Sequence, residues 1–119
     1  EKAGYPDLGV CLDTAHLFAS GYDIRTKEAV KNTLKRFSSI VGLGKLKLLH
    51  GNDSKAGFGE RKDRHEHIGR GKIGLEGFAT ILNDPHLKGI DLIIETPLER
   101  VEDDITNLKK LKSLKYRFS

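Results

Sequence analysis

The sequence predicts an α/β protein built on a parallel sheet, because short apolar runs alternate with stretches of helical periodicity. Three apolar runs have the length and composition of buried parallel strands: Leu8–Leu12, Leu46–Leu49 and Leu92–Ile94. Between and after them lie segments with apolar residues every three or four positions. The expected order is therefore strand, helix, strand, loop, helix, strand, helix.

Three helices are expected from this periodicity. Their apolar stripes are Val30, Leu34, Phe37 and Val41; Leu75, Phe78, Ala79 and Leu82; and Val101, Ile105, Leu108 and Leu111. Thr26 has the position of an N-cap for the first helix, and Gly42 is placed to end it. The dipeptide Asp84-Pro85 is expected to end the second helix.

Composition bounds the possible functions. The chain has 119 residues, of which 37% are hydrophobic and 32% charged, so one folded core is expected and disorder is not. No apolar run approaches the roughly 20 residues that span a bilayer, and the first residues lack signal-peptide character. We therefore expect no membrane partner and an intracellular, cytoplasmic location, or a nuclear or mitochondrial one in a eukaryote.

Charge and cysteine content add two expectations. The net charge of +4 suits a phosphate-rich partner, although lysines on the outer faces of helices explain much of it. Cys11 is the only cysteine, so an intrachain disulfide is impossible. Because it lies between Val10 and Leu12, we expect its side chain to be buried and inert.

Metal-binding residue types follow the predicted strands. Asp13 and His16 come after the first strand, His50 after the second and Glu95 after the third. The carboxyl ends of parallel strands meet at one edge of a sheet, where reactive groups gather. Neutral imidazoles and carboxylates are ligands that zinc prefers. The pattern therefore predicts a metal site at this edge.

A fourth region adds Asp63 and His65, in a segment too rich in glycine and charge to be expected as a regular element. In an extended chain, residues two apart point to the same side, so both side chains can face one ligand. Taken singly, each candidate has a simpler explanation. Asp13 could be only a helix N-cap, Glu95 only a loop carboxylate, and a lone histidine a surface group.

Two further histidines are weaker candidates. His67 is expected to have a plain loop role or to support His65, and His86, in a turn after a proline, is expected at the surface.

Four sequence blocks together resemble the endonuclease IV family, and they occur in the family's order. They are Gly9-Val10-Cys11-Leu12-Asp13-Thr14-Ala15-His16, His50-Gly51-Asn52-Asp53-Ser54-Lys55, Asp63-Arg64-His65-Glu66-His67-Ile68-Gly69-Arg70-Gly71 and Ile93-Ile94-Glu95-Thr96-Pro97. The resemblance runs from residue 9 to residue 97 and thus covers most of the chain.

The resemblance implies a fold and an activity. Members are (β/α)8 TIM barrels that hold three zinc ions and cleave the DNA backbone 5′ to abasic sites, in base excision repair. A barrel of this kind needs roughly 250 residues. The chain, residues 1–119, is therefore expected to be a single partial domain: the C-terminal part of a barrel, about three βα units. Its expected partners are abasic double-stranded DNA and a missing N-terminal half. Alone, it is expected to be inactive and to associate with itself.

The resemblance also implies roles for individual residues. Asp13, His50 and Glu95 match ligands of one zinc of a catalytic pair, with Glu95 acting at the reacting centre. A third zinc would be held by His16, Asp63 and His65. Candidate DNA contacts are Arg64, Lys55 and Asn52. Gly51 stands where a larger apolar residue is usual, which predicts looser packing of the strand that carries His50.

Two alternatives to this activity stay open. A metal-dependent sugar isomerase or epimerase would share the barrel and some of the ligands, and it would act on sugars without DNA. The other alternative is a non-catalytic fragment that binds metal or DNA.

Overall fold

The structure is a computed structural model that describes residues 9–97 and 99–118, with only the backbone described for residues 116–118. Three parallel strands form its main sheet in the order β1-β2-β5. These strands are β1 (Val10–Asp13), β2 (Leu46–His50) and β5 (Asp91–Ile93). The predicted α/β class and parallel sheet are confirmed. Strand bounds differ from the expected ones by one or two residues, and Leu8 lies outside the described residues.

The three expected helices are present as α2 (Lys27–Ile40), α3 (Leu75–Asn83) and α4 (Val101–Phe118). Thr26 is the N-cap of α2, where its side chain accepts a hydrogen bond from the backbone N–H of Ala29 at 3.1 Å. The helix ends just before Gly42, whose φ of 99° is a left-handed conformation that glycine adopts without strain. The start and stop signals of α2 are thus used as predicted.

Several short elements were not expected from the sequence: α1 (Thr14–Ala19), β3 (Asp53–Ser54), β4 (His65–Glu66) and the 3₁₀ turns η1 (Leu43–Lys45) and η2 (Pro85–Leu87). Strands β3 and β4 pair antiparallel, so the loop that carries Asp63 and His65 contains a small regular element. Six-residue helices and two-residue strands are too short to show a periodic apolar pattern. The expectation of an irregular loop is therefore wrong at residues 65–66.

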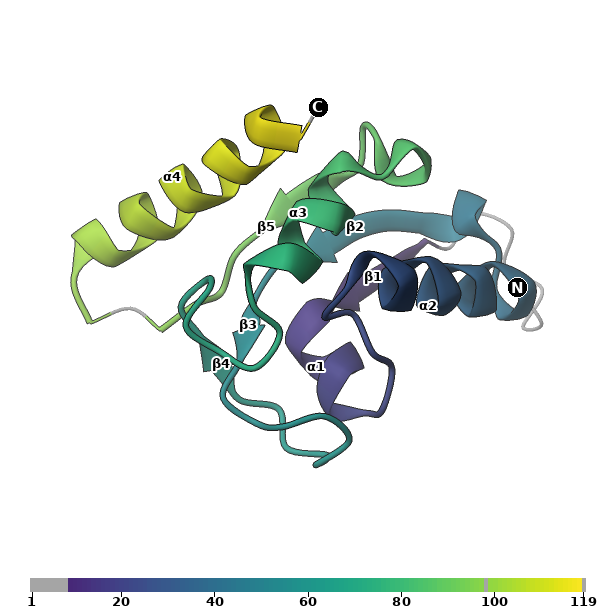
Figure 1. The fold of residues 1–119 in the computed structure, drawn as a ribbon, viewed down its shortest axis with the longest axis horizontal. Coiled ribbons are helices and arrows are strands. Elements are labelled where there is room, and N and C mark those ends of the chain that lie inside the picture. The colour runs from purple at the N-terminus through teal and green to yellow at the C-terminus, as the bar shows by residue number, and fades with distance from the viewer. Residues whose placement is uncertain (1–8, 98, 119) are drawn as a thin grey trace.

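One face of the sheet is covered by helices and the other is open. The helices α2, α3 and α4 lie on the same side of the sheet, with α3 between the other two (Figure 1). Leu12, Leu49 and Leu92, which are aligned across the three strands, pack with this core. On the opposite face Cys11 is exposed and Ile93 is 47% exposed. The predicted burial of the strands is therefore wrong for this face, and Cys11 is not buried, because nothing in the described part of the chain covers it.

Helix α4 also turns a different face inward from the one expected. Of its predicted apolar stripe, Val101 is 73% exposed, Ile105 49% and Leu108 46%. Leu111, the fourth residue of the stripe, is buried as expected, and it shares the inward face with Asn107 and Leu114. The side-chain oxygen of Asn107 accepts a hydrogen bond from the backbone N–H of Ile68 at 2.9 Å. A buried amide needs such a partner.

Among the described residues, no helix is both long enough and apolar enough to cross a membrane.

Candidate metal centre

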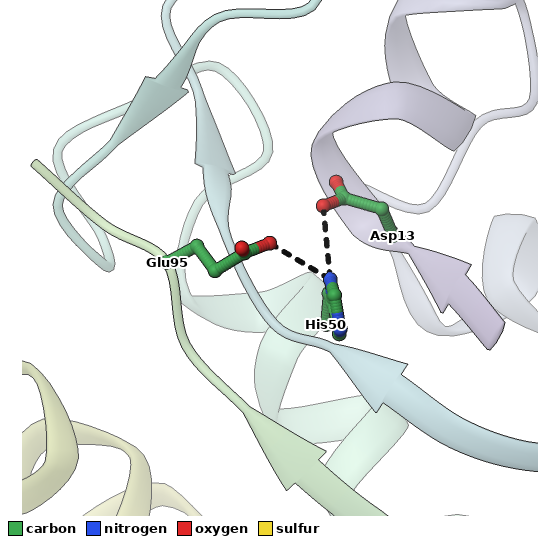
Figure 2. Close-up of side chains that lie close together, drawn as sticks. All are labelled: Asp13, His50 and Glu95. Carbon is green, nitrogen blue, oxygen red and sulfur yellow. Dashed lines mark ion pairs between the residues drawn. The ribbon is translucent and has the colours of Figure 1, made fainter.

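The carboxyl ends of the three strands bring three predicted site residues together. Asp13 and His50 are the last residues of β1 and β2, and Glu95 follows β5 by two residues. The Nδ1 atom of His50 lies 2.8 Å from Oε1 of Glu95 and 3.8 Å from Oδ2 of Asp13 (Figure 2). One ligand atom from each of the three residues fits within a 4.8 Å group. This separation suits one shared metal ion.

A second group of donors joins Asp13 to the β4 region. The Nε2 atom of His65 lies 3.5 Å from Oδ2 of Asp13 and 3.5 Å from Oδ1 of Asp63. These three residues also place ligand atoms within 4.8 Å of one another. The structure thus brings together five of the six predicted ligands, and Asp13 belongs to both groups.

The orientation of His65 is fixed by a backbone contact. Its Nδ1 lies 2.9 Å from the carbonyl oxygen of Glu95. A carbonyl can only accept, so Nδ1 donates this hydrogen bond. Metal-binding histidines commonly donate their second ring N–H to such a carbonyl. The other ring nitrogen, Nε2, is therefore the one that faces Asp13 and Asp63.

Asp13 is also a helix N-cap. Its Oδ1 accepts a hydrogen bond from the backbone N–H of His16 at 3.0 Å, at the start of α1. The same carboxylate turns Oδ2 toward His50 and His65. Asp13 is thus the N-cap that would explain it more simply, and its other carboxylate oxygen is still available to a metal.

His16 is the predicted ligand that the structure does not bring into either group. Its side chain is exposed, and within the described residues Asp13 takes the third place beside Asp63 and His65. The grouping therefore differs from the expected set of His16, Asp63 and His65. Metal binding by His16 stays a prediction.

Two buried residues after β2 organise the site, and neither role was predicted. The side chain of Asn52 is fully buried, where Nδ2 donates to Oδ2 of Asp13 at 3.0 Å and Oδ1 accepts from the backbone N–H of Glu95 at 2.6 Å. This burial contradicts the expectation that Asn52 contacts DNA. The sequence feature that could have indicated this role is the position of Asn52, two residues after His50, a candidate ligand at the end of a strand.

Asp53 is also fully buried and holds the glycine-rich loop at residues 69–74. Its carboxylate accepts hydrogen bonds from the backbone N–H groups of Gly69, Gly71 and Ile73 at 2.9 to 3.0 Å. Position 71 requires glycine, because a Cβ there would collide with the Asp53 carboxylate and the Ser54 carbonyl. The loop that follows β4 is therefore fixed to the strand-end region by one side chain.

The donors fit a zinc ion chemically. They are imidazole nitrogens and carboxylate oxygens, in groups of three that leave a fourth position for water or substrate. In the described part of the chain, the ion pairs of Asp13, Asp63 and Glu95 are all with histidines. A metal cation at either group would neutralise the charge of these carboxylates.

Residues 1–114 match the family model described as xylose isomerase-like TIM barrel. The chain belongs to this family. It is 50% identical over 116 residues to a probable endonuclease 4 of Citrifermentans bemidjiense, an alignment that covers 96% of this chain and 41% of that protein. It is 53% identical over 90 residues to an apurinic-apyrimidinic endonuclease of Caenorhabditis elegans, which covers 76% of this chain and 23% of that protein.

The crystal structure of endonuclease IV from Thermus thermophilus has the same fold over the matched part. It superposes with a TM-score of 0.82 at 39% identity and covers 92% of this chain and 39% of that chain. The predicted resemblance to endonuclease IV and the partial TIM barrel are confirmed. The chain spans about two fifths of the length of these bacterial relatives.

Other residues of this TIM-barrel segment depart from expectation. Gly51 is buried, and the side chain of Leu92 fills the space that a Cβ at position 51 would take. Its backbone N–H donates to the carbonyl of Ile93 at 2.8 Å, so the predicted loosening of the strand is wrong. Partial desolvation raises the pKa of the Cys11 thiol, and the carboxylates of Asp13 and Glu95 raise it further. Cys11 is thus protonated near neutral pH.

The remaining candidates lie around the two donor groups. Arg64 and Lys55 are exposed, and the backbone N–H of Lys55 donates to the carbonyl of Arg64 at 3.0 Å. His67 is half-buried, with Nδ1 at 3.0 Å from Nδ2 of Asn107. His86 is exposed, as predicted.

Proposed function

We propose that the protein containing these residues is a zinc-dependent DNA repair endonuclease that cleaves the phosphodiester backbone 5′ to abasic sites. The observation that carries the proposal is the meeting of Asp13, His50 and Glu95 at one edge of the sheet. Similarity to proteins named endonuclease 4 and apurinic-apyrimidinic endonuclease supports the same activity. DNA as substrate would place the protein inside the cell.

Each donor group has a part in this function. Asp13, His50 and Glu95 would hold one zinc, while Asp63 and His65, with Asp13 or His16, would hold another. Bound zinc lowers the pKa of a water and neutralises charge on the attacking and leaving oxygens. Glu95, whose side chain is 55% exposed, is more open to substrate than Asp13 and His50, which are 19% and 26% exposed. It is therefore the residue that we place at the reacting centre.

DNA would approach over the exposed residues beside the donors. Arg64 lies between the two ligands of the β4 region, and both Arg64 and Lys55 are exposed. Their charges would attract the phosphates of the backbone. Abasic nucleotides are less costly to extrude from the duplex than intact ones, because they have no base to unstack.

A nicking assay tests the proposed function. The protein, with any flanking residues that its gene encodes, should cut a duplex with one abasic site and leave the intact duplex uncut. Chelation with EDTA should abolish cutting, and added zinc should restore it. Absence of cutting by a folded, zinc-loaded protein would contradict the proposal. Isomerisation of an aldose without DNA would favour the alternative suggested by the family's xylose isomerase-like barrel.

A further inference from the structure

We propose that Asn52 is a positioning residue that sets the Asp13 carboxylate and the Glu95 backbone for metal binding. The inference rests on the metal site of the proposed function and assigns a role to a residue that is not itself a metal donor. Asn52 follows β2, the central strand, and its side chain reaches Asp13, the last residue of β1, and Glu95, two residues after β5. One amide thus links the ends of all three strands.

The orientation of this amide is determined by its partners. The backbone N–H of Glu95 can only donate, so the atom at 2.6 Å from it must be the carbonyl oxygen of Asn52. The Asp13 carboxylate is a natural acceptor, so it receives the amide N–H at 3.0 Å. A reversed amide would place donor against donor and acceptor against acceptor. Asn52 therefore has a single favourable orientation.

The backbone of Asn52 is fixed as firmly as its side chain. Its N–H donates to the hydroxyl of Thr14 at 2.8 Å, and the same hydroxyl donates to its carbonyl oxygen at 2.6 Å. Thr14 is 2% exposed and is the first residue of α1, directly after Asp13. Burial removes water as a competing partner for these groups. Asp13 and Asn52 are thus coupled in two ways. The Asn52 side chain bonds Asp13 directly, and the backbone of Asn52 is held by Thr14, the residue after Asp13.

The consequence for the site concerns one oxygen atom. Oδ2 of Asp13 receives the Asn52 amide and is also the atom that faces both His50 and His65. A carboxylate oxygen has two lone-pair sites, so one hydrogen bond leaves room for a metal. The hydrogen bond to the Glu95 N–H fixes the backbone on which the Glu95 ligand stands. Loss of Asn52 would leave both ligands free to move without removing either of them.

The test replaces Asn52 with leucine, which has a similar volume and no hydrogen-bonding group. Zinc affinity is measured by competition with a chromophoric chelator, in the protein with any flanking residues that its gene encodes. We expect Asn52→Leu to bind zinc roughly 10- to 100-fold more weakly than the unsubstituted protein, as is usual when a residue supporting metal ligands is lost.

Asn107→Leu is the matched control. Asn107 is 2% exposed and has polar contacts with Ile68, Thr96, Asp103 and His67, none of which belongs to either donor group. This variant should lose stability and keep zinc affinity within about threefold. Equal losses of affinity in the two leucine variants would assign Asn52 a general packing role and overturn the proposal.

A second pair of variants covers the case in which Asn52→Leu does not fold. Thr14→Val removes the hydroxyl that fixes Asn52, whereas Thr14→Ser keeps it. We expect the valine variant to bind zinc roughly tenfold more weakly and the serine variant to bind normally. A folded valine variant with unchanged affinity would overturn the proposal. An unsubstituted protein that binds no zinc would overturn the proposed function as well, so the two failures are distinguishable.

Discussion

At the scale of single residues, Asp13 serves both the fold and the candidate site. One carboxylate oxygen caps α1, and the other faces two histidines and receives the Asn52 amide. The N-cap hydrogen bond therefore fixes the direction of the second oxygen. From sequence, capping and metal binding were competing explanations for Asp13. The structure makes them compatible, because a carboxylate has two oxygens that can point to different partners.

In a protein of the relatives' full length, Glu95→Gln should abolish cleavage of abasic DNA while leaving DNA binding largely intact. The substitution keeps the size of the side chain and removes the charge that lies 2.8 Å from His50. Loss of a metal ligand should lower the cleavage rate by roughly 100-fold or more. Single-turnover nicking and equilibrium binding to the same duplex measure the two effects. Glu99→Gln, at an exposed position near the start of α4, is the control. A loss of binding as large as the loss of rate would argue against this role.

Arg64→Ala should weaken binding to DNA with little effect on zinc content. Arg64 is exposed between Asp63 and His65, where its charge can meet a phosphate. Affinity for DNA falls as salt rises, and losing one phosphate contact should make the plot of log affinity against log salt less steep by about one unit of slope. Arg36→Ala is a suitable control, since Arg36 is exposed on α2, on the covered side of the sheet. An unchanged salt slope would show that Arg64 does not contact the backbone.

At the scale of elements, the sequence predicted the parts with a strong apolar period and missed the short ones. The strands and the helices α2, α3 and α4 were found, and Thr26 and Gly42 marked the ends of α2 correctly. The pair β3 and β4 was missed because two-residue strands are too short to show an apolar period. The role of Asp53 was missed because its hydrogen bonds to the loop at residues 69–74 depend on tertiary contacts.

Asp53→Asn should destabilise this loop and the protein as a whole. An amide at position 53 would turn a donor toward backbone N–H groups that now point at a carboxylate. Hydrogen bonds to charged groups contribute about 1.5 to 3 kcal/mol, so we expect a loss of roughly 2 to 4 kcal/mol in the free energy of unfolding. Urea denaturation measures it. Asp91→Asn, at an exposed position on β5, is the matched control and should change stability by less than about 0.5 kcal/mol. Equal effects would contradict the role of Asp53.

At the scale of the whole molecule, the open face of the sheet could not be predicted from local patterns. The apolar runs indicate strands, but burial depends on what lies over each face, and the described residues cover only one. The same limit applies to α4, where Asn107 is buried and three residues of the predicted apolar stripe are exposed. For the site, strand-end positions predicted most of the donors. The membership of His16 could not be decided, because it depends on side-chain direction within the first turn of α1.

The exposed apolar residues predict the behaviour of the 119-residue chain when it is prepared alone. Ile93, on the open face, is 47% exposed, and Val101, Ile105 and Leu108 are exposed along one side of α4. Exposed apolar side chains on both sides of the sheet favour association. We therefore expect concentration-dependent oligomers in sedimentation velocity. Replacing Ile105 and Leu108 with lysine should shift the chain toward monomer, whereas Ile40→Lys, at an exposed position at the end of α2, should not.

We also predict that this chain alone cleaves abasic DNA at least roughly 100-fold more slowly than a protein of the relatives' full length. Its two donor groups share Asp13, and among the described residues His16 lies in neither group, so the structure does not present two separate sets of three donors. Two metal ions that act on the attacking and leaving oxygens together must be held about 3.5 to 4 Å apart. The chain also spans only about two fifths of its bacterial relatives, which leaves room for further donors in a longer protein. Nicking of an abasic duplex by the zinc-loaded chain measures the rate, with the sedimenting species identified in the same buffer. Rapid, EDTA-sensitive nicking by a monomer would show that these residues suffice for the site.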